Sequence, residues 1–130
     1  MKKFILIFIF AVFALSADAQ TDVRQIRPDF SQNPNAKYRL FPTTNMWIFI
    51  KLNTADGRLW LVQYSTKAGE QLEKPLSRIE RVDESEKKDG RFTLYSTQNM
   101  YNFLLLDQID GRVWQVQWST GADNLVIPIN

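Results

Sequence analysis

Two stretches of the chain share one pattern of apolar and polar positions. Each opens with a nearly continuous apolar run, 46–52 or 100–106, then passes through Asp-Gly into a run that alternates between apolar and polar residues. Residues 45–66 and 99–120 match at a constant offset of 54 without a gap, and 12 of the 22 positions are identical. The chain therefore contains a tandem duplication, in which each copy is one supersecondary unit.

Each copy predicts a β-hairpin. The apolar runs have the length of strands and are rich in aromatic and branched side chains, which favours strands covered on both faces over helices. Asp-Gly between two such runs is a strong turn signal, because glycine adopts a positive φ at little steric cost. The predicted hairpin turns are Asp56-Gly57 and Asp110-Gly111.

The strands after these turns predict which face lies in the core. Trp60, Val62 and Tyr64 fall on one face of the first, and the second repeats the pattern as Trp-x-Val-x-Trp. We expect this aromatic face to be the core face in both copies. The predicted structural core consists of Trp60, Trp114, Phe49, Phe103, Val62 and Val116.

Shorter strands are predicted on either side of each hairpin. Residues 38–41 and 92–95 precede the apolar runs, and weaker candidates follow at 71–76 and 125–129. Aligning the last two requires a slip of one residue, which matches a proline in each and indicates edge strands.

The chain is thus predicted to be all-β. Two tandem antiparallel meanders of three or four strands should form one small sandwich or partly closed barrel with approximate two-fold symmetry. A four-stranded meander also resembles one propeller blade, but two blades would not close a ring without oligomerising.

The first 19 residues have the features of a secretory signal peptide. Two lysines precede an apolar run of 12 residues, and the small-x-small sequence Ala17-Asp18-Ala19 follows. The run is too short to remain as a membrane span, so we expect cleavage between Ala19 and Gln20 and export to the periplasm or the medium of a bacterium.

The remaining chain is predicted to hold an irregular segment, 20–36, and a single β domain, 37–130. This domain comprises the first repeat (37–76), a charged connector (77–90) and the second repeat (91–130). Because the charges of the connector are of both signs, we expect it to be exposed and solvated.

Composition excludes several classes of function. The chain has no histidine and no cysteine, which removes the usual general base, the commonest metal ligand, zinc sites of the usual kind and disulfides. Without the leader, 14 basic and 13 acidic residues remain, so no long-range field attracts nucleic acid. We expect no cofactor and no metal, since the Asp107 loop fails the spacing of a calcium-binding EF-hand.

Carboxylates are the remaining candidates for catalysis. Glycoside hydrolysis needs two carboxyl groups at a set separation, and the repeats supply Asp56, Asp107 and Asp110. Their position in tight loops favours a turn-forming role instead.

Aromatic side chains are the better candidates for binding. Trp47 and Tyr101 share a face with Lys51 and Leu105, which makes exposure easier there. An exposed pair could stack on sugar rings or anchor a protein partner. The candidate ligand-binding residues are Trp47, Tyr101, Trp118 and Tyr64.

The repeat Asn-Met-Trp/Tyr-x-Phe followed by Asp-Gly-Arg-x-Trp-x-Val-Gln-Trp/Tyr-Ser resembles one found in small exported bacterial proteins of unknown function. The resemblance implies a β-rich fold and export, and it brings no activity. Our leading hypothesis is a non-enzymatic module that binds a protein or a cell-surface glycan. The alternatives are a small carboxylate enzyme acting on polysaccharide and a structural envelope component that pairs an edge strand with a partner.

Overall fold

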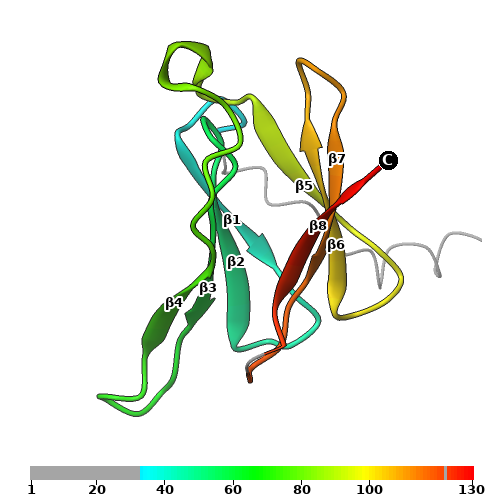
Figure 1. Cartoon of the computed structure of the whole chain (residues 1–130). Coiled ribbons are helices and arrows are strands. Elements are labelled where there is room, and N and C mark those ends of the chain that lie inside the picture. The colour runs from blue at the N-terminus through cyan, green and yellow to red at the C-terminus, as the bar shows by residue number, and fades with distance from the viewer. Residues whose placement is uncertain (1–32, 122) are drawn as a thin grey trace, which may run out of the picture. The chain divides into compact units, whose positions relative to one another are not determined.

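The computed structural model describes residues 33–121 and 123–130, which contain eight strands in two antiparallel meanders (Figure 1). Each meander is a four-stranded sheet whose strands lie in sequence order. The first sheet consists of β1 (Tyr38–Pro42), β2 (Ile48–Asn53), β3 (Leu59–Gln63) and β4 (Leu72–Ser77). The second consists of β5 (Phe92–Ser96), β6 (Asn102–Asp107), β7 (Val113–Gln117) and β8 (Leu125–Ile129). The all-β prediction is confirmed.

Some predictions fall outside the described residues. These are the signal peptide 1–19, its cleavage after Ala19 and most of the segment 20–36. In the part of the chain that is described, no helix has the length and apolar character needed to cross a membrane.

The two hairpin turns form as their sequences predict. Gly57 and Gly111 have φ values of 84° and 79°, the left-handed region that glycine adopts without steric cost. In each loop the first residue closes the turn, since its carbonyl accepts from the glycine N–H and its side-chain oxygen accepts from a backbone N–H two residues later. Asn53 fills this position in the first loop and Asp107 in the second.

The fourth strands form as well, and each carries its proline at an edge. Pro75 pairs with Trp60 and Pro128 pairs with Trp114, which are equivalent positions of the two copies. The one-residue slip between the copies comes from the preceding loop, which runs over 64–71 between Gln63 and its partner Leu72 but only over 118–124 between Gln117 and its partner Leu125.

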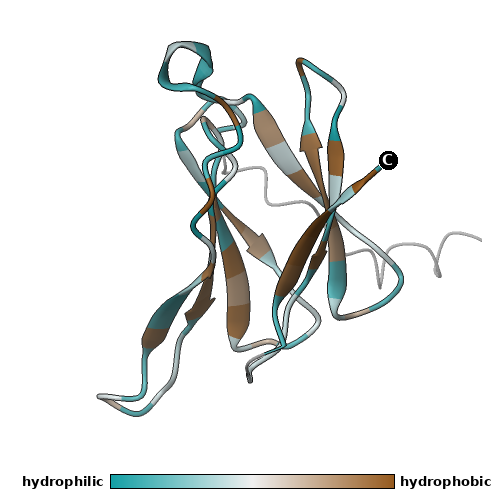
Figure 2. Ribbon diagram, in the orientation of Figure 1, coloured by the Kyte–Doolittle hydropathy of each residue, from teal (hydrophilic) through white to brown (hydrophobic). Residues whose placement is uncertain are grey.

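The core lies between one face of each sheet, and the sheets do not close into a barrel. Figure 2 shows that apolar residues are concentrated along the strands, whereas the connector is mostly hydrophilic. β2 contacts β5, and β4 contacts β8. The first sheet contributes Ile48, Ile50, Leu52, Leu59 and Leu61 to the core. The second contributes Phe92, Leu94, Phe103, Leu105, Trp114, Val116 and Trp118.

Half of the predicted core residues lie elsewhere. The buried ones are Phe103, Trp114 and Val116. The prediction is wrong for Phe49, Trp60 and Val62, which are only partly buried. They lie on the face of the first sheet opposite the core, because strand neighbours alternate between faces and Ile48, Ile50, Leu59 and Leu61 point inward.

Equivalent positions of the two copies therefore bury opposite faces. Phe49 and Phe103 match in the duplication, yet only Phe103 is in the core. The expected two-fold symmetry would bury the same face of both sheets. Instead, the sheets follow one another front to back, as adjacent blades of a propeller do.

Two pairs of equivalent residues explain this choice. On one face the first copy has Lys51 where the second has Leu105, and on the other face the first copy has Leu61 where the second has Gln115. A charged or amide side chain in the core costs free energy unless every polar atom is paired. Each sheet therefore turns its more apolar face inward, and that face differs between the copies.

The connector covers the first hairpin loop rather than being solvated throughout. The N–H of Arg81 donates to the Asp56 carbonyl at 2.8 Å, and its guanidinium donates to the Gly57 carbonyl at 2.8 Å. Burial of this guanidinium lowers the pKa of Arg81 to about 10. Beyond the connector, the N–H of Phe92 donates to the Thr54 carbonyl at 2.8 Å, so the start of the second sheet is hydrogen-bonded to the first loop.

The equivalent tryptophans provide a test of the face that each sheet buries. Trp114→Ala removes a core side chain and should lower the free energy of unfolding by about 3–5 kcal/mol. Trp60→Ala removes a partly exposed ring and should cost about 1–2 kcal/mol. Urea denaturation followed by circular dichroism measures both, and equal losses would contradict the front-to-back packing.

Candidate functional site

The first sheet presents an apolar surface on the side away from the core. We call it the outer aromatic face, and it consists of Tyr38, Trp47, Phe49, Trp60, Val62 and Tyr64. The register brings these residues together: Phe49 pairs with Val62, and the Tyr64 N–H donates to the Trp47 carbonyl at 3.1 Å. Tyr38, Trp47 and Tyr64 are 49%, 37% and 44% exposed.

The rings of this face form two groups. The Tyr64 ring lies 5.0 Å from that of Trp47 and 6.4 Å from that of Phe49, and Tyr38 and Trp60 lie 6.2 Å apart. The interplanar angles are 49–59°, which is a tilted arrangement of the kind favoured by aromatic pairs. The surface is therefore made of tilted rings rather than of a flat platform.

Lys51 is the charged residue at the centre of this face. Its Nζ lies 4.8 Å from the centroid of the Trp60 ring and 5.4 Å from that of Tyr38, and it forms an ion pair with Glu73 on β4. The ammonium group is thus paired and lies over π faces, which reduces the cost of covering it.

A shallow depression of about 660 Å³ lies on the same face. Its lining includes Tyr38 of β1, Lys51 of β2 and Glu73 of β4. Val62 of β3 and Tyr64, which follows β3, also line it. The sequence did not indicate Tyr38 or Glu73 as site residues, because they come from flanking strands that only the sheet brings beside Trp60 and Val62.

The four predicted ligand-binding residues separate into two equivalent pairs. Trp47 and Tyr64 lie together on the outer aromatic face. Tyr101 and Trp118 pack at 5.4 Å in the second copy, but Trp118 is 1% exposed and its Nε1 donates to the Met100 carbonyl at 3.1 Å. Trp118 is therefore a core residue, and its prediction as a binding residue is wrong.

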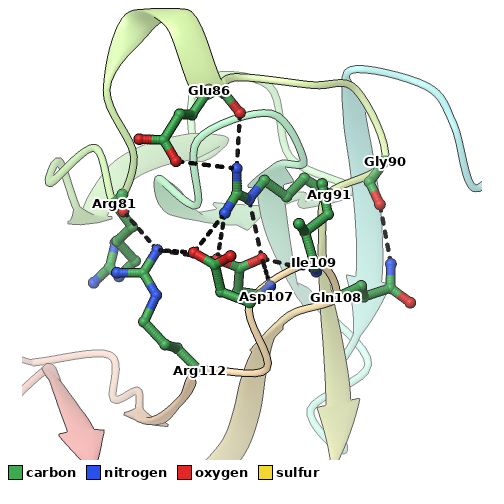
Figure 3. A network of polar contacts seen from close by, with 9 residues as sticks. Arg81, Glu86, Gly90, Arg91, Asp107, Gln108, Ile109 and Arg112 are labelled. Carbon is green, nitrogen blue, oxygen red and sulfur yellow. Dashed lines mark hydrogen bonds and ion pairs between the residues drawn. The ribbon is translucent and has the colours of Figure 1, made fainter.

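The predicted carboxylates belong to ionic networks at the hairpin loops. In the second copy Arg91 binds Asp107 through two hydrogen bonds, Nε to Oδ1 and Nη2 to Oδ2, both 3.0 Å (Figure 3). Arg112 Nη2 donates to Asp107 Oδ2 at 3.0 Å and to the Arg81 carbonyl at 3.1 Å. Arg91 Nη2 also donates to Asp110 at 2.9 Å. This network ties the loop to the connector.

Asp107 is ionised at neutral pH although its side chain is 0% exposed. Burial by itself raises the pKa of this carboxyl. The hydrogen bonds from Arg91, from the backbone N–H groups of Asp110 and Ile109 and from Arg112 outweigh burial and lower its pKa to about 2.

The first copy places its buried carboxylate at a different position of the same loop. Asp56 is 1% exposed, and its Oδ2 lies 3.0 Å from Arg58 Nε and 3.5 Å from Lys87 Nζ. Its equivalent Asp110 is 47% exposed, whereas Asp107 is replaced by the neutral Asn53. Each loop thus buries one carboxylate and pairs it with two cations.

These carboxylates do not suit glycoside hydrolysis. A general acid must keep its proton near neutral pH, and a nucleophile must reach the substrate. Asp107 and Asp56 are buried against cations, and Asp110 shares Arg91 with Asp107. We call the group of Arg91, Arg112, Asp107 and Asp110 the clamp, because its ion pairs hold the second hairpin loop in place. The sequence did not indicate the role of Arg91, because it lies 16 residues before Asp107 and only strand pairing brings the two together.

No group of three or more His, Cys, Asp or Glu side chains within residues 33–121 and 123–130 is arranged to hold a metal ion. None of the protein-family models, curated proteins or solved structures compared with this chain matches it.

The clamp predicts unequal effects of removing its two carboxylates. Asp107→Asn keeps the loop hydrogen bonds, as Asn53 shows in the first copy, but leaves Arg91 without its main counter-charge. The free energy of unfolding should fall by about 3 kcal/mol. Asp110→Asn is the matched control, and at this exposed position the loss should stay below about 1 kcal/mol. Chemical denaturation measures both, and similar losses would contradict the clamp.

The same carboxyl predicts a pH dependence of stability. Its pKa is lowered from 3.8 to about 2 on folding, so its contribution is present above about pH 4 and is lost as the pH falls toward 2. The shift corresponds to about 2 kcal/mol. The difference in unfolding free energy between the unmodified chain and Asp107→Asn should narrow by this amount between about pH 5 and pH 2. A difference that does not change with pH would contradict the lowered pKa.

Proposed function

We propose that this chain is an exported, non-catalytic binding module that recognises a protein through the outer aromatic face. The observation that carries the proposal is a cluster of aromatic side chains, led by Trp47, Tyr64 and Trp60, that is partly solvent-exposed although the fold has a separate core. Contiguous exposed apolar surface of this kind is typical of interaction sites, where tryptophan and tyrosine contribute most of the binding energy.

The character of this surface favours a protein over a glycan. Sugar rings stack on exposed ring faces and need polar groups beside them. Here the rings are tilted toward one another, and the lining of the depression is mainly apolar, although Gln63 and Gln71 also border it. The nearby charges of Lys51 and Glu73 are already paired. An apolar protein surface satisfies these groups better than a hydroxyl-rich ligand does.

The geometry gives less support to the other two hypotheses. Asp107 and Asp110 bind Arg91, and Asp56 binds Arg58 and Lys87, so each repeat carboxylate is paired with a cation rather than held as a free acid or base. Of the four edge strands, β1, β4 and β8 carry a proline, which removes a hydrogen-bond donor and disfavours the addition of a further strand, whereas β5 carries none.

Site-directed photo-cross-linking tests the proposal. A photoreactive phenylalanine analogue at Val62, in cells that express residues 1–130, should give a discrete protein adduct that mass spectrometry identifies. The matched control has the same analogue at Ile79, which is 65% exposed in the connector. No adduct beyond that of the control would refute a protein-binding role.

A titration with glycans separates the two ligand classes. We expect tryptophan fluorescence of the purified chain to remain unchanged on addition of soluble β-glucan, chitin or peptidoglycan fragments. A saturable change that Trp47→Ala abolishes would show sugar binding instead.

A further inference from the structure

We propose that the chain assembles head to tail with further copies of itself. In this assembly the outer aromatic face of one copy packs on the outer face of the second sheet of the next copy. The inference rests on the protein-binding function proposed above and specifies the partner. The outer face of the second sheet consists of Tyr95, Leu104, Leu106, Val113, Ile127 and Ile129.

The contact between the two sheets of one chain, which we call the internal seam, is the template for the contact between copies. Within the chain, the second sheet presents its aromatic face to the first sheet. The outer aromatic face is the equivalent face of the first sheet, at the constant offset of 54. The equivalent pairs are Tyr38 and Phe92, Trp47 and Tyr101, Phe49 and Phe103, Trp60 and Trp114, Val62 and Val116, and Tyr64 and Trp118.

The outer face of the second sheet corresponds to the other half of the seam. Its residues are equivalent to residues that pack in the core from the first sheet. The equivalent pairs are Tyr95 and Phe41, Leu104 and Ile50, Leu106 and Leu52, and Val113 and Leu59. Each chain therefore exposes two outer faces, and each of them is equivalent in sequence to one side of its own core.

The apolar runs at 46–52 and 100–106 are explained by this arrangement. Their pattern is typical of strands covered on both faces. The described chain covers one face of each sheet and leaves the other with partly exposed residues such as Phe49 and Leu104. A further copy on each side covers the remaining faces.

Polar residues at central positions make the contact between copies weaker than the internal seam. Lys51 replaces an equivalent leucine on the outer aromatic face, and Gln115 and Asn102 replace Leu61 and Ile48 on the other outer face. These groups are already paired within the chain, since Gln115 Nε2 donates to Asn102 Oδ1 at 2.9 Å and Lys51 pairs with Glu73. They can therefore be covered without being left unsatisfied. We expect assembly to depend on concentration.

The contact joins two different surfaces, so it is heterologous. Such contacts close into a ring if the rotation between copies permits and otherwise continue as a filament. Propeller rings contain about four to eight blades, which corresponds to about two to four copies of a chain with two sheets.

Two variants and their mixture test the proposal. Val62→Glu places a charge on the outer aromatic face, and Leu104→Glu does so on the outer face of the second sheet. In sedimentation velocity the unmodified chain, purified from cells expressing residues 1–130, should form oligomers as its concentration rises. Each variant alone should sediment as a monomer. Their equimolar mixture should form a dimer and nothing larger, because only one intact pair of surfaces remains.

Controls separate association from folding. Ile79→Glu, in the connector, should assemble like the unmodified chain. Each variant should keep the circular dichroism spectrum and a cooperative melt. If one does not, Tyr64→Glu replaces Val62→Glu and Ile127→Glu replaces Leu104→Glu, since both residues are more exposed.

Several results would overturn the inference. One is a monomer at every concentration, and another is oligomers that persist in both single variants. A dimer that only Val62→Glu disrupts would indicate contact between two outer aromatic faces instead.

Photo-cross-linking from Val62 distinguishes a failure of self-assembly from a failure of the proposed binding function. An adduct with a different protein would leave the binding role intact while excluding self-assembly. An adduct to residues 20–32 of the same chain would exclude both partners.

Discussion

The structure depends on the burial of opposite faces by two sheets of matching sequence. Both copies have the same order of strands and the same glycine turns, but the first sheet turns Ile50 and Leu61 inward and the second turns Phe103 and Trp114 inward. Each sheet has two largely apolar faces. One face packs in the core, and the other face therefore remains on the surface. The outer aromatic face is therefore a consequence of how the core is built.

The ionic networks tie each hairpin loop to the connector. Asp107 is buried and ionised because Arg91 and Arg112 both bind it, and Arg81 links the connector to the first loop. A buried charge is tolerated only when its hydrogen-bonding capacity is satisfied, so these contacts allow little freedom in the position of the connector. The residues considered as catalytic carboxylates thus anchor the loops to the connector.

The distribution of polar substitutions connects the fold with the proposed interaction. Lys51 and Gln115 each lie on the outward side of their own sheet, where they limit the apolar surface that a single chain exposes to water. The aromatic residues around Lys51 are retained, although a sheet exposed for solubility alone would tolerate polar residues there. A surface that keeps the composition of the core while carrying one paired charge is suited to reversible contact with a matching apolar surface.

The sequence by itself determined the strands, the glycine turns and the edge prolines, because these follow from local backbone preferences and from pairing between neighbouring segments. Only the tertiary structure decided which face of each sheet is buried. Alternation with a period of two places residues on faces but does not say which face is inside when both are apolar. Differences such as Lys51 against Leu105 carried that information, and their effect depends on the free-energy cost of burying a charge between the sheets. The partner of Asp107 was likewise beyond sequence patterns, since Arg91 reaches it only through the pairing of β5 with β6.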